Sequence, residues 1–308
     1  MTPPLLQLEA PQGLFHDLRV EPEEARSILR PQQDERYGFG FALSPYRGCG
    51  HGCRYCYVRD YPQPVPGASG AVHDPADWGS WAVPKLNAPE LLWSQRHRLH
   101  GQSVFMASAT DPYQPLEREF RLTRGCLEVL LQCPTTRVIV HTRSPLVLQD
   151  LELLKAFGPR LSVGFSIPTD DDTVRQVVEP KAPAIPSRWA AVERLTRAGI
   201  PVTVAVAPLM PVFNPAAFAR RAVASGARGA WVGGLRLLKD DPFHELLVRN
   251  DWLFILDPDY AESVRAALRE AFPAEAMAAR GRRGRKPTPL PPPPPRLQGH
   301  QPGLFDGM

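Results

Sequence analysis

Three cysteines crowd the stretch Ser44-Pro-Tyr-Arg-Gly-Cys49-Gly-His-Gly-Cys53-Arg-Tyr-Cys56-Tyr57. They are separated by three and then two residues, so their thiolates can wrap one corner of an iron–sulfur cubane, each binding a different iron. The glycines at 48, 50 and 52 relieve the steric restrictions on the tight loop that this demands. A [4Fe–4S] cluster normally takes four cysteine thiolates. Three thiolates therefore leave one iron open to a chelating substrate.

A zinc site with His51 as its fourth ligand is the alternative interpretation of this loop. Structural zinc ligands usually come as two separated pairs, whereas His51 lies inside the loop and the sequence shows no second pair. The two remaining cysteines, Cys126 and Cys133, are seven residues apart on a predicted helix. We expect both to be small buried apolar residues.

Around the cysteines, short β-prone runs alternate with helical runs. This alternation predicts right-handed βαβ units and a parallel α/β sheet, either closed partly into a barrel or lying flat as a doubly wound sheet. Periodicity does not choose between the two. The predicted strands are 39–43, 103–108, 137–142, 161–166, 201–207 and 229–235. The predicted helices are 89–99, 123–132, 145–156, 187–198, 215–225, 240–249 and 259–271.

Polar or small residues stand where several predicted strands end. The cysteine loop follows the first strand, and Ser108-Ala-Thr-Asp111 ends the second. Later strands end at Thr142-Arg143, Ser166 and Gly233-Gly234. In a barrel, chemistry gathers in the loops at this edge. The pattern predicts a shared cavity, although the same residues would also serve as ordinary turns.

The Cys-x3-Cys-x2-Cys spacing, with Tyr55 before the last cysteine, resembles the signature of the radical S-adenosylmethionine (SAM) superfamily. The resemblance covers roughly residues 38–258. Within the superfamily, the sequence is similar to the branch that includes spore photoproduct lyase, a group often called DNA repair photolyase-like. The motifs that carry it are Thr110-Asp-Pro-Tyr-Gln-Pro115, Leu122-Thr-Arg, Thr142-Arg-Ser-Pro145, Glu179-Pro-Lys-Ala-Pro183, Gly199-Ile-Pro-Val202 and Ala207-Pro208.

This resemblance implies a partial (β/α)6 barrel and a radical SAM enzyme, with a [4Fe–4S] cluster and S-adenosylmethionine as cofactors. The implied reaction is reductive cleavage of SAM to a 5′-deoxyadenosyl radical, which abstracts a hydrogen atom from the substrate. An external electron donor is implied as a partner. DNA is the implied substrate, with a repair lyase as the implied type of enzyme.

The resemblance also implies which residues contact SAM. Tyr55 is expected on the adenine side, and Thr110 and Asp111 near the methionine amino group. Arg143 stands where relatives more often have lysine, and its cation would pair with the SAM carboxylate. Ser166 is expected to reach the carboxylate or the ribose. Without the family, Asp111 would be a turn or helix-capping residue and Arg143 a surface charge.

One departure from the resemblance concerns the hydrogen donor. Spore photoproduct lyase has a cysteine near the end of the second strand, where this sequence has Ser108-Ala-Thr110. A serine O–H bond is too strong to donate a hydrogen atom efficiently to a radical. The substrate is therefore expected to differ from spore photoproduct, and RNA, a protein or a small molecule is an alternative.

The chain is expected to have three parts. An N-terminal arm, 1–36, carries one short helical stretch at 23–29, and the radical SAM domain spans 37–275. The tail, 276–308, is basic and proline-rich, which predicts disorder. Its Gln301-Pro-Gly-Leu304-Phe305 resembles the peptide that docks into the bacterial sliding clamp, so a catalytically idle, clamp-recruited binding module is a further alternative.

Composition limits the location and partners of the protein. The sequence has no apolar run of the ~20 residues that a bilayer needs, and its first eight residues lack the pattern of a secretory signal. We therefore expect a cytoplasmic protein with no membrane partner. The net charge is only +4, but the basic cluster 280–286 could contact nucleic-acid phosphates. Trp78 and Trp81 could stack on bases, or pack in the core of an irregular loop.

Overall fold

The computed structural model describes residues 18–34, 38–106, 108–237 and 241–273. Within them, a seven-stranded sheet has the order β10-β9-β8-β7-β6-β3-β2, and only β2 runs antiparallel to its neighbour. The strands are β2 (Leu29–Pro31), β3 (Phe41–Leu43), β6 (Ser103–Met106), β7 (Arg137–Thr142), β8 (Leu161–Ser166), β9 (Val202–Val206) and β10 (Gly229–Val232).

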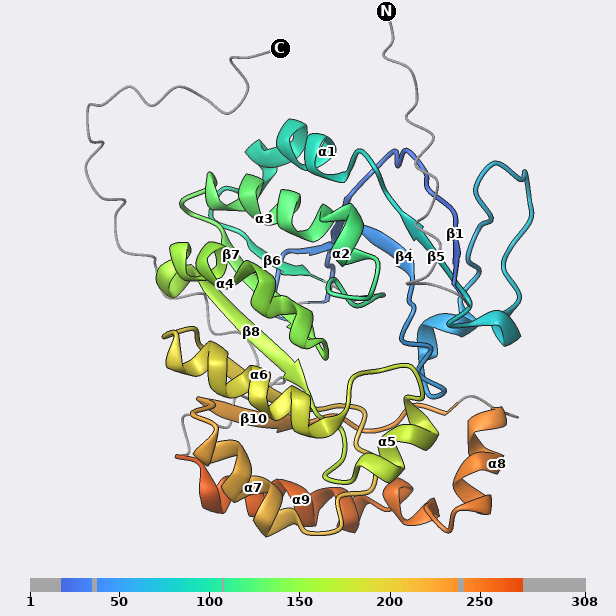
Figure 1. Cartoon of the computed structure of the whole chain (residues 1–308), viewed down its shortest axis with the longest axis vertical. Helices are drawn as coiled ribbons and strands as arrows, with labels where there is room; N and C mark the ends of the chain where they lie inside the picture. The colour runs from blue at the N-terminus through green and yellow to red at the C-terminus, as the bar shows by residue number, and fades with distance from the viewer. Residues whose placement is uncertain (1–17, 35–37, 107, 238–240, 274–308) are drawn as a thin grey trace, which may run out of the picture.

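The parallel strands follow one another in space in the order in which they occur along the chain. Each connection therefore advances in the same direction, and the right-handed rule places the connecting helices on one face. Figure 1 shows these helices in an arc, from α1 (Ala88–Gln95) at the top to α7 (Pro215–Ala224) and α9 (Pro258–Ala271) at the bottom. A doubly wound sheet would have helices on both faces. The predicted partial (β/α)6 barrel is thus confirmed.

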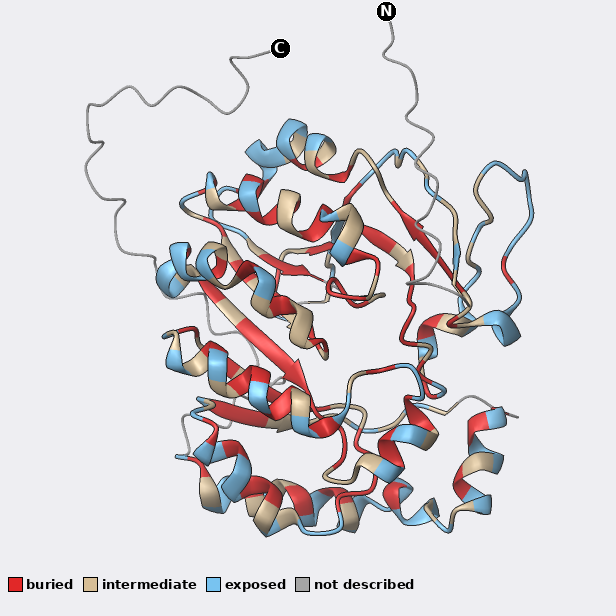
Figure 2. Cartoon of the chain, viewed as in Figure 1, coloured by how far each residue is buried: buried red, intermediate tan, exposed pale blue. Residues whose placement is uncertain are grey.

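Buried apolar side chains explain why the central strands pair. In β9, Val202, Val204 and Val206 are fully buried, and β8 buries Val163 and Phe165 equally well. Parallel strands covered on both faces have such near-continuous apolar sequences. Figure 2 shows the burial concentrated on the strands and on the inward faces of the helices. The core also contains Cys126 and Cys133, as expected from sequence.

Side-chain caps fix the start of several helices. Asp171 Oδ1 accepts a hydrogen bond from Thr173 N at 2.6 Å at the start of α5 (Asp172–Val178). Similar caps from an asparagine or aspartate precede α7, α8 (Pro242–Arg249) and α9, each of which has proline at its first position. The other α-helices in the described residues are α2 (Glu117–Phe120), α3 (Leu122–Leu131), α4 (Leu151–Ala156) and α6 (Ile185–Arg197).

A small second sheet, β1-β5-β4, was not predicted. It consists of β1 (Arg19–Val20), β4 (Tyr46–Gly48) and β5 (Trp81–Pro84). The predicted helix at 23–29 is wrong, because the backbone of this segment bonds to neighbouring chain instead of to itself. Ala25 N donates to Asn87 Oδ1 at 2.8 Å, and Ala25 O accepts from Asn87 Nδ2 at 3.0 Å. Residues 18–34 of the predicted arm therefore contribute strands to both sheets.

The predicted tail 276–308, including the basic cluster 280–286 and Gln301, Leu304 and Phe305, lies outside the described residues. Among the helices that the structure does describe, none combines the length and the apolar character needed to cross a bilayer.

A buried carboxylate, Glu117, ties the small sheet to the barrel. It accepts hydrogen bonds from Thr123 N and Arg124 N, both at 3.0 Å, at the start of α3. The Tyr46 hydroxyl, on the strand before the cysteine loop, donates to the same carboxylate. Burial outweighs these bonds and raises the pKa of Glu117 to about 7.

Replacing Glu117 by glutamine is expected to flatten the pH dependence of stability between pH 5 and 7. The raised pKa means that the folded state keeps a proton that the unfolded state releases near pH 4.3. The native chain is therefore expected to lose up to about 3 kcal/mol as the pH rises through 7, at ~1.4 kcal/mol per pKa unit. Urea unfolding at pH 5, 6, 7 and 8 measures this. Equal pH slopes for the two proteins would contradict the assignment.

Candidate active site

The cysteine loop begins directly after β4 and turns sharply. Gly48 has a φ of +69° and Gly52 a φ of +54°. A Cβ atom on Gly48 would meet the Trp81 ring at 2.5 Å, and one on Gly52 would lie 3.1 Å from Gly79 Cα. Both positions therefore require glycine, because of backbone conformation and because of space.

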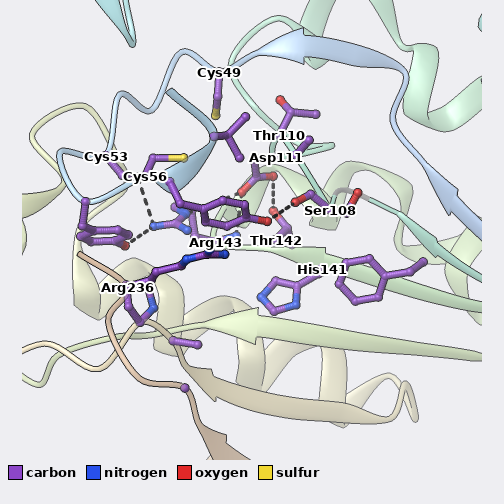
Figure 3. A pocket seen from close by; sticks show the side chains of 18 of the residues that line it. Cys49, Cys53, Cys56, Ser108, Thr110, Asp111, His141, Thr142, Arg143 and Arg236 are labelled. Carbon is purple, nitrogen blue, oxygen red and sulfur yellow. Dashed lines mark hydrogen bonds and ion pairs between the residues drawn. The ribbon is translucent and has the colours of Figure 1, made fainter. Parts of the chain in front are cut away.

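The three thiols of this loop face one cavity of about 690 Å³, and none of them forms a disulfide. Figure 3 shows Cys49, Cys53 and Cys56 above the cavity, with His141 and Arg236 below. Burial raises the pKa of Cys49 to about 11 and those of Cys53 and Cys56 to about 12. Each thiol therefore keeps its proton until a metal displaces it.

The donor set fits an iron–sulfur cluster. An iron–sulfur cluster takes cysteine thiolates as its ligands. Here three thiols free of disulfides face one cavity, and the loop that carries them is too tight for larger residues at its glycines. In the described part of the chain, no three His, Cys, Asp or Glu side chains gather as the ligands of a single ion would. Thiolates that bind different irons of a cubane stand farther apart than the ligands of one ion, so the cysteines need not gather so closely.

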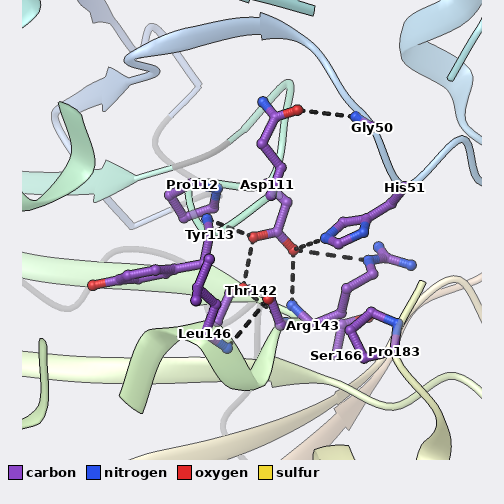
Figure 4. A network of polar contacts seen from close by, with 12 residues as sticks. Gly50, His51, Asp111, Pro112, Tyr113, Thr142, Arg143, Leu146, Ser166 and Pro183 are labelled. Carbon is purple, nitrogen blue, oxygen red and sulfur yellow. Dashed lines mark hydrogen bonds and ion pairs between the residues drawn. The ribbon is translucent and has the colours of Figure 1, made fainter. Parts of the chain in front are cut away.

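His51 does not line this cavity. Its Nε2 lies 3.5 Å from Asp111 Oδ2, and both side chains are buried (Figure 4). The structure therefore gives the zinc alternative no support, because its proposed fourth ligand does not line the cavity that the three thiols face.

Asp111, in the loop after β6, organises the cavity wall. Its carboxylate accepts hydrogen bonds from Thr142 Oγ1 at 2.6 Å, and from the backbone N–H groups of Tyr113 and Arg143 at 2.9 Å each (Figure 4). Burial opposes ionisation, but His51 and these donors outweigh it and hold the pKa of Asp111 well below its usual range. The cavity therefore has a fixed negative charge next to the ends of β6 and β7.

Arg143, directly after β7, reaches across to the cysteine loop. Its Nη1 lies 3.2 Å from Cys53 Sγ and 2.7 Å from the Tyr55 hydroxyl, and it also pairs with Glu179. Tyr55 donates its own hydroxyl proton to Glu179 and packs edge-on against Phe243 of α8. The predicted SAM ligands Tyr55, Asp111 and Arg143 thus meet at the cavity.

Of the other two predicted SAM ligands, one lines the cavity and one does not. Thr110 lines it, and its hydroxyl donates to Gly48 O at 2.5 Å, joining the second strand end to the cysteine loop. Ser166 is buried and does not line the cavity; its Oγ lies 3.5 Å from the backbone oxygen of Ala207, which does line it.

The wall opposite the cysteines is aromatic. Phe39 stacks on Phe105 with ring centroids 4.9 Å apart, and His141 contacts Trp231 edge-on at 6.3 Å. Trp78 also lines the cavity, whereas Trp81 is buried against His73 at 3.7 Å and is a core residue. Arg236, which is exposed, lies at the rim.

Sequence reasoning did not assign roles to Glu179, Arg188, His141, Trp231 or Arg236. Glu179 begins the motif Glu179-Pro-Lys-Ala-Pro183, so the charged residue of this proline-rich motif could have been proposed as a site residue from sequence. His141 alternates with buried residues along β7, which places it on the inner face of the barrel. Arg188 had no such signal, because it lies on an amphipathic helix that also carries exposed arginines.

Several curated proteins are similar in sequence. An uncharacterized protein of Methanocaldococcus jannaschii is 30% identical over 174 residues, which are 56% of this chain and 62% of that protein. An uncharacterized protein of Mycobacterium tuberculosis is 30% identical over 214 residues, 65% of this chain and 59% of that one. The chain spans about three fifths of the length of these relatives.

A solved structure and a family model complete the comparison. A spore photoproduct lyase mutant with bound AdoMet and dinucleoside spore photoproduct has a TM-score of 0.60, over 82% of this chain and 78% of that one. At 14% identity this likeness shows the fold alone. The model of the Radical SAM superfamily matches residues 43–221. Because that match covers more than half of the chain and includes the cysteine loop, Asp111 and Arg143, the protein belongs to the radical SAM superfamily.

Proposed function

We propose that this protein cleaves S-adenosylmethionine reductively at a [4Fe–4S] cluster held by Cys49, Cys53 and Cys56, and that it acts on DNA. One observation carries the first part. The three thiols face the same cavity as Asp111 and Arg143. Its volume of about 690 Å³ lies within the ~300–1,000 Å³ of ordinary ligand sites.

The residues around the cavity offer charges that match the methionine part of SAM. The ionised Asp111 suits an ammonium group together with Thr110, and the Arg143 guanidinium suits a carboxylate. Tyr55 would lie on the adenine side. For Ser166, contact with the carboxylate or ribose stays a prediction. Cys49, Cys53 and Cys56 would hold the cluster, which would supply the electron that breaks the bond between the SAM sulfur and the 5′ carbon, giving methionine and a 5′-deoxyadenosyl radical for hydrogen abstraction from the substrate.

The aromatic wall supports a nucleic-acid substrate. Flat rings such as Phe105 and Trp231 can stack on bases, and the exposed Arg236 at the rim can contact a phosphate. The spore photoproduct lyase structures of the same fold include one with dinucleoside spore photoproduct. DNA repair, and a lyase reaction in particular, is therefore the proposed activity.

The substrate is tested by incubating the reduced protein with SAM deuterated at the 5′ carbon, and with ultraviolet-irradiated or untreated DNA. We expect irradiated DNA to increase 5′-deoxyadenosine and change its deuterium content through hydrogen exchange with the substrate. Irradiated RNA, a protein extract and a metabolite mixture serve as parallel arms. Stimulation by one of these but not by DNA would contradict the DNA proposal and favour the alternative of radical chemistry on RNA, a protein or a small molecule.

The hydrogen donor is expected to differ from that of spore photoproduct lyase. Ser108 and Ala109 line the cavity, and neither can replace the cysteine that the resemblance implies at this position. The remaining cysteines, Cys126 and Cys133, are in the core. We therefore propose a substrate other than spore photoproduct. The alternative of a catalytically idle, clamp-recruited binding module is disfavoured, because all three cysteines face the cavity.

The proposed clamp contact of the tail gives a separate prediction. Replacing Leu304 and Phe305 by alanine is expected to abolish co-purification with the bacterial sliding clamp, because two apolar anchors supply the affinity of a short groove-binding peptide. Replacing Leu297 and His300 by alanine in the same tail is the matched control and should leave binding intact. Clamp binding that survives loss of Leu304 and Phe305 would remove this proposal.

A further inference from the structure

Arg188 and Glu179 form an ion pair that is fully closed off from solvent: the side chains of both are 0% exposed. Arg188 also donates to Pro183 O at 2.8 Å and to Ser166 O at 3.3 Å, so the guanidinium is anchored to the backbone at two points. Glu179 uses its second oxygen for Arg143 and the Tyr55 hydroxyl. The carboxylate thus links a fixed arginine to the cavity.

Arg143 is held at both ends. Its backbone N–H is bound by Asp111, and its Nη1 is bound by Glu179, while the same Nη1 lies 3.2 Å from Cys53 Sγ. The order of charges from the core outward is Arg188, Glu179, Arg143 and then the Cys53 sulfur. Figure 3 shows the Arg143 side chain reaching toward the cysteine loop.

Stability alone does not explain a buried ion pair of this kind. Removing two charges from water costs several kcal/mol per ion, and apolar residues of similar volume are often at least as stabilising. The pair contacts the site at Arg143 and Tyr55, which suggests that it serves the site.

We propose that the Glu179–Arg188 pair positions the Arg143 guanidinium against Cys53, and thereby raises the reduction potential of the cluster that the three cysteines would hold. The inference rests on the proposed function in that it requires this cluster. Reduction adds a negative charge to a cluster, so a nearby cation favours the reduced form. Hydrogen bonds to the sulfurs are among the factors that set such potentials.

The test measures the midpoint potential of the reconstituted cluster in the full-length protein, by dithionite titration followed with electron paramagnetic resonance and without SAM. The double variant Glu179→Gln/Arg188→Met removes one charge of each sign, so the net charge of the protein is unchanged, and Arg143 keeps Asp111 as a charged neighbour at 4.0 Å. We expect its potential to become more negative. Arg143→Met is expected to shift the potential in the same direction.

Coupling distinguishes positioning from a merely structural effect. If the pair acts through Arg143, the triple variant should have the same potential as Arg143→Met alone, because the two changes then remove the same interaction. Arg143→Lys keeps the cation but not the planar fork, and its potential should lie between those of the native protein and Arg143→Met. These two Arg143 variants leave the buried pair intact if the double variant folds poorly.

A second ion pair provides the matched control. Glu193 of α6 and Arg221 of α7 are joined at 2.6 Å, and neither lines the cavity. Glu193→Gln/Arg221→Met should leave the potential unchanged. A native potential in the double variant, or shifts that simply add to that of Arg143→Met, would overturn the inference. Failure of the native chain to bind iron would instead overturn the proposed function, so the two failures are distinguishable.

Discussion

Replacing Cys53 by alanine is expected to abolish both cluster binding and SAM cleavage. Cys53 is buried at the centre of the site, where its sulfur faces the cavity and contacts Arg143. Two thiolates cannot hold a cubane that already lacks its fourth cysteine ligand. Iron content, the charge-transfer absorption of the cluster and 5′-deoxyadenosine are therefore expected to fall to the level of the protein-free control.

The matched control for this change is Cys133→Ala. Cys133 is also buried, but it lies in the core after α3, where its sulfur contacts only Val129 O at 3.6 Å among the described hydrogen-bond partners. The control should keep its iron and its activity. Retention of a SAM-cleaving cluster by Cys53→Ala would contradict the assignment of the three ligands.

Replacing Asp111 by alanine is expected to destabilise the fold by about 3–5 kcal/mol, the usual cost of removing one partner from a buried charged network. The change leaves two buried backbone N–H groups and the Thr142 hydroxyl without their acceptor, and removes the carboxylate that faces His51. Because Asp111 also holds the backbone of Arg143, we expect SAM affinity to fall at least about tenfold, which is ~1.4 kcal/mol. Urea unfolding and equilibrium SAM binding measure the two effects.

The loss of folding stability caused by Asp111→Ala is expected to depend on pH. The pKa of Asp111 is lowered in the folded state, so its stabilisation is present above the unfolded pKa near 3.9 and is lost as the pH falls below it. The difference between native protein and variant should therefore shrink below pH 4.

Asp170→Ala is the matched control, because Asp170 also accepts two backbone N–H groups at 2.9 Å, from Phe213 and Asn214, and does not line the cavity. It should lose stability and keep its SAM affinity. Equal loss of SAM affinity in both variants would contradict a local role for Asp111.

Much of the barrel could be predicted because each unit carries its own pattern. β7 and β8 have the bounds expected from their apolar runs, and α7 begins at a proline after a capping asparagine. The small sheet could not be predicted, because β1 is only two residues long and pairs with Trp81 and Ala82, far along the chain. Its stability comes from tertiary contacts that local propensity does not encode.

Some residues of the candidate site could likewise be predicted from the sequence, and others could not. Cysteine spacing identified the proposed cluster ligands. Position at strand ends placed Asp111 and Arg143 at a shared cavity, and only the family resemblance implied their roles. Glu179 and Arg188 act through contacts that are invisible in sequence: Glu179 pairs with Arg143, 36 positions away in the chain. A charged residue on a predicted helix is usually solvated, and only the fold reveals that Arg188 is buried.

The most direct test of the account is anaerobic reconstitution with iron and sulfide, followed by dithionite reduction and measurement of 5′-deoxyadenosine from SAM. We expect about four irons per chain and formation of 5′-deoxyadenosine that depends on Cys49, Cys53 and Cys56. Bound zinc, or a cluster that forms but never cleaves SAM, would contradict it.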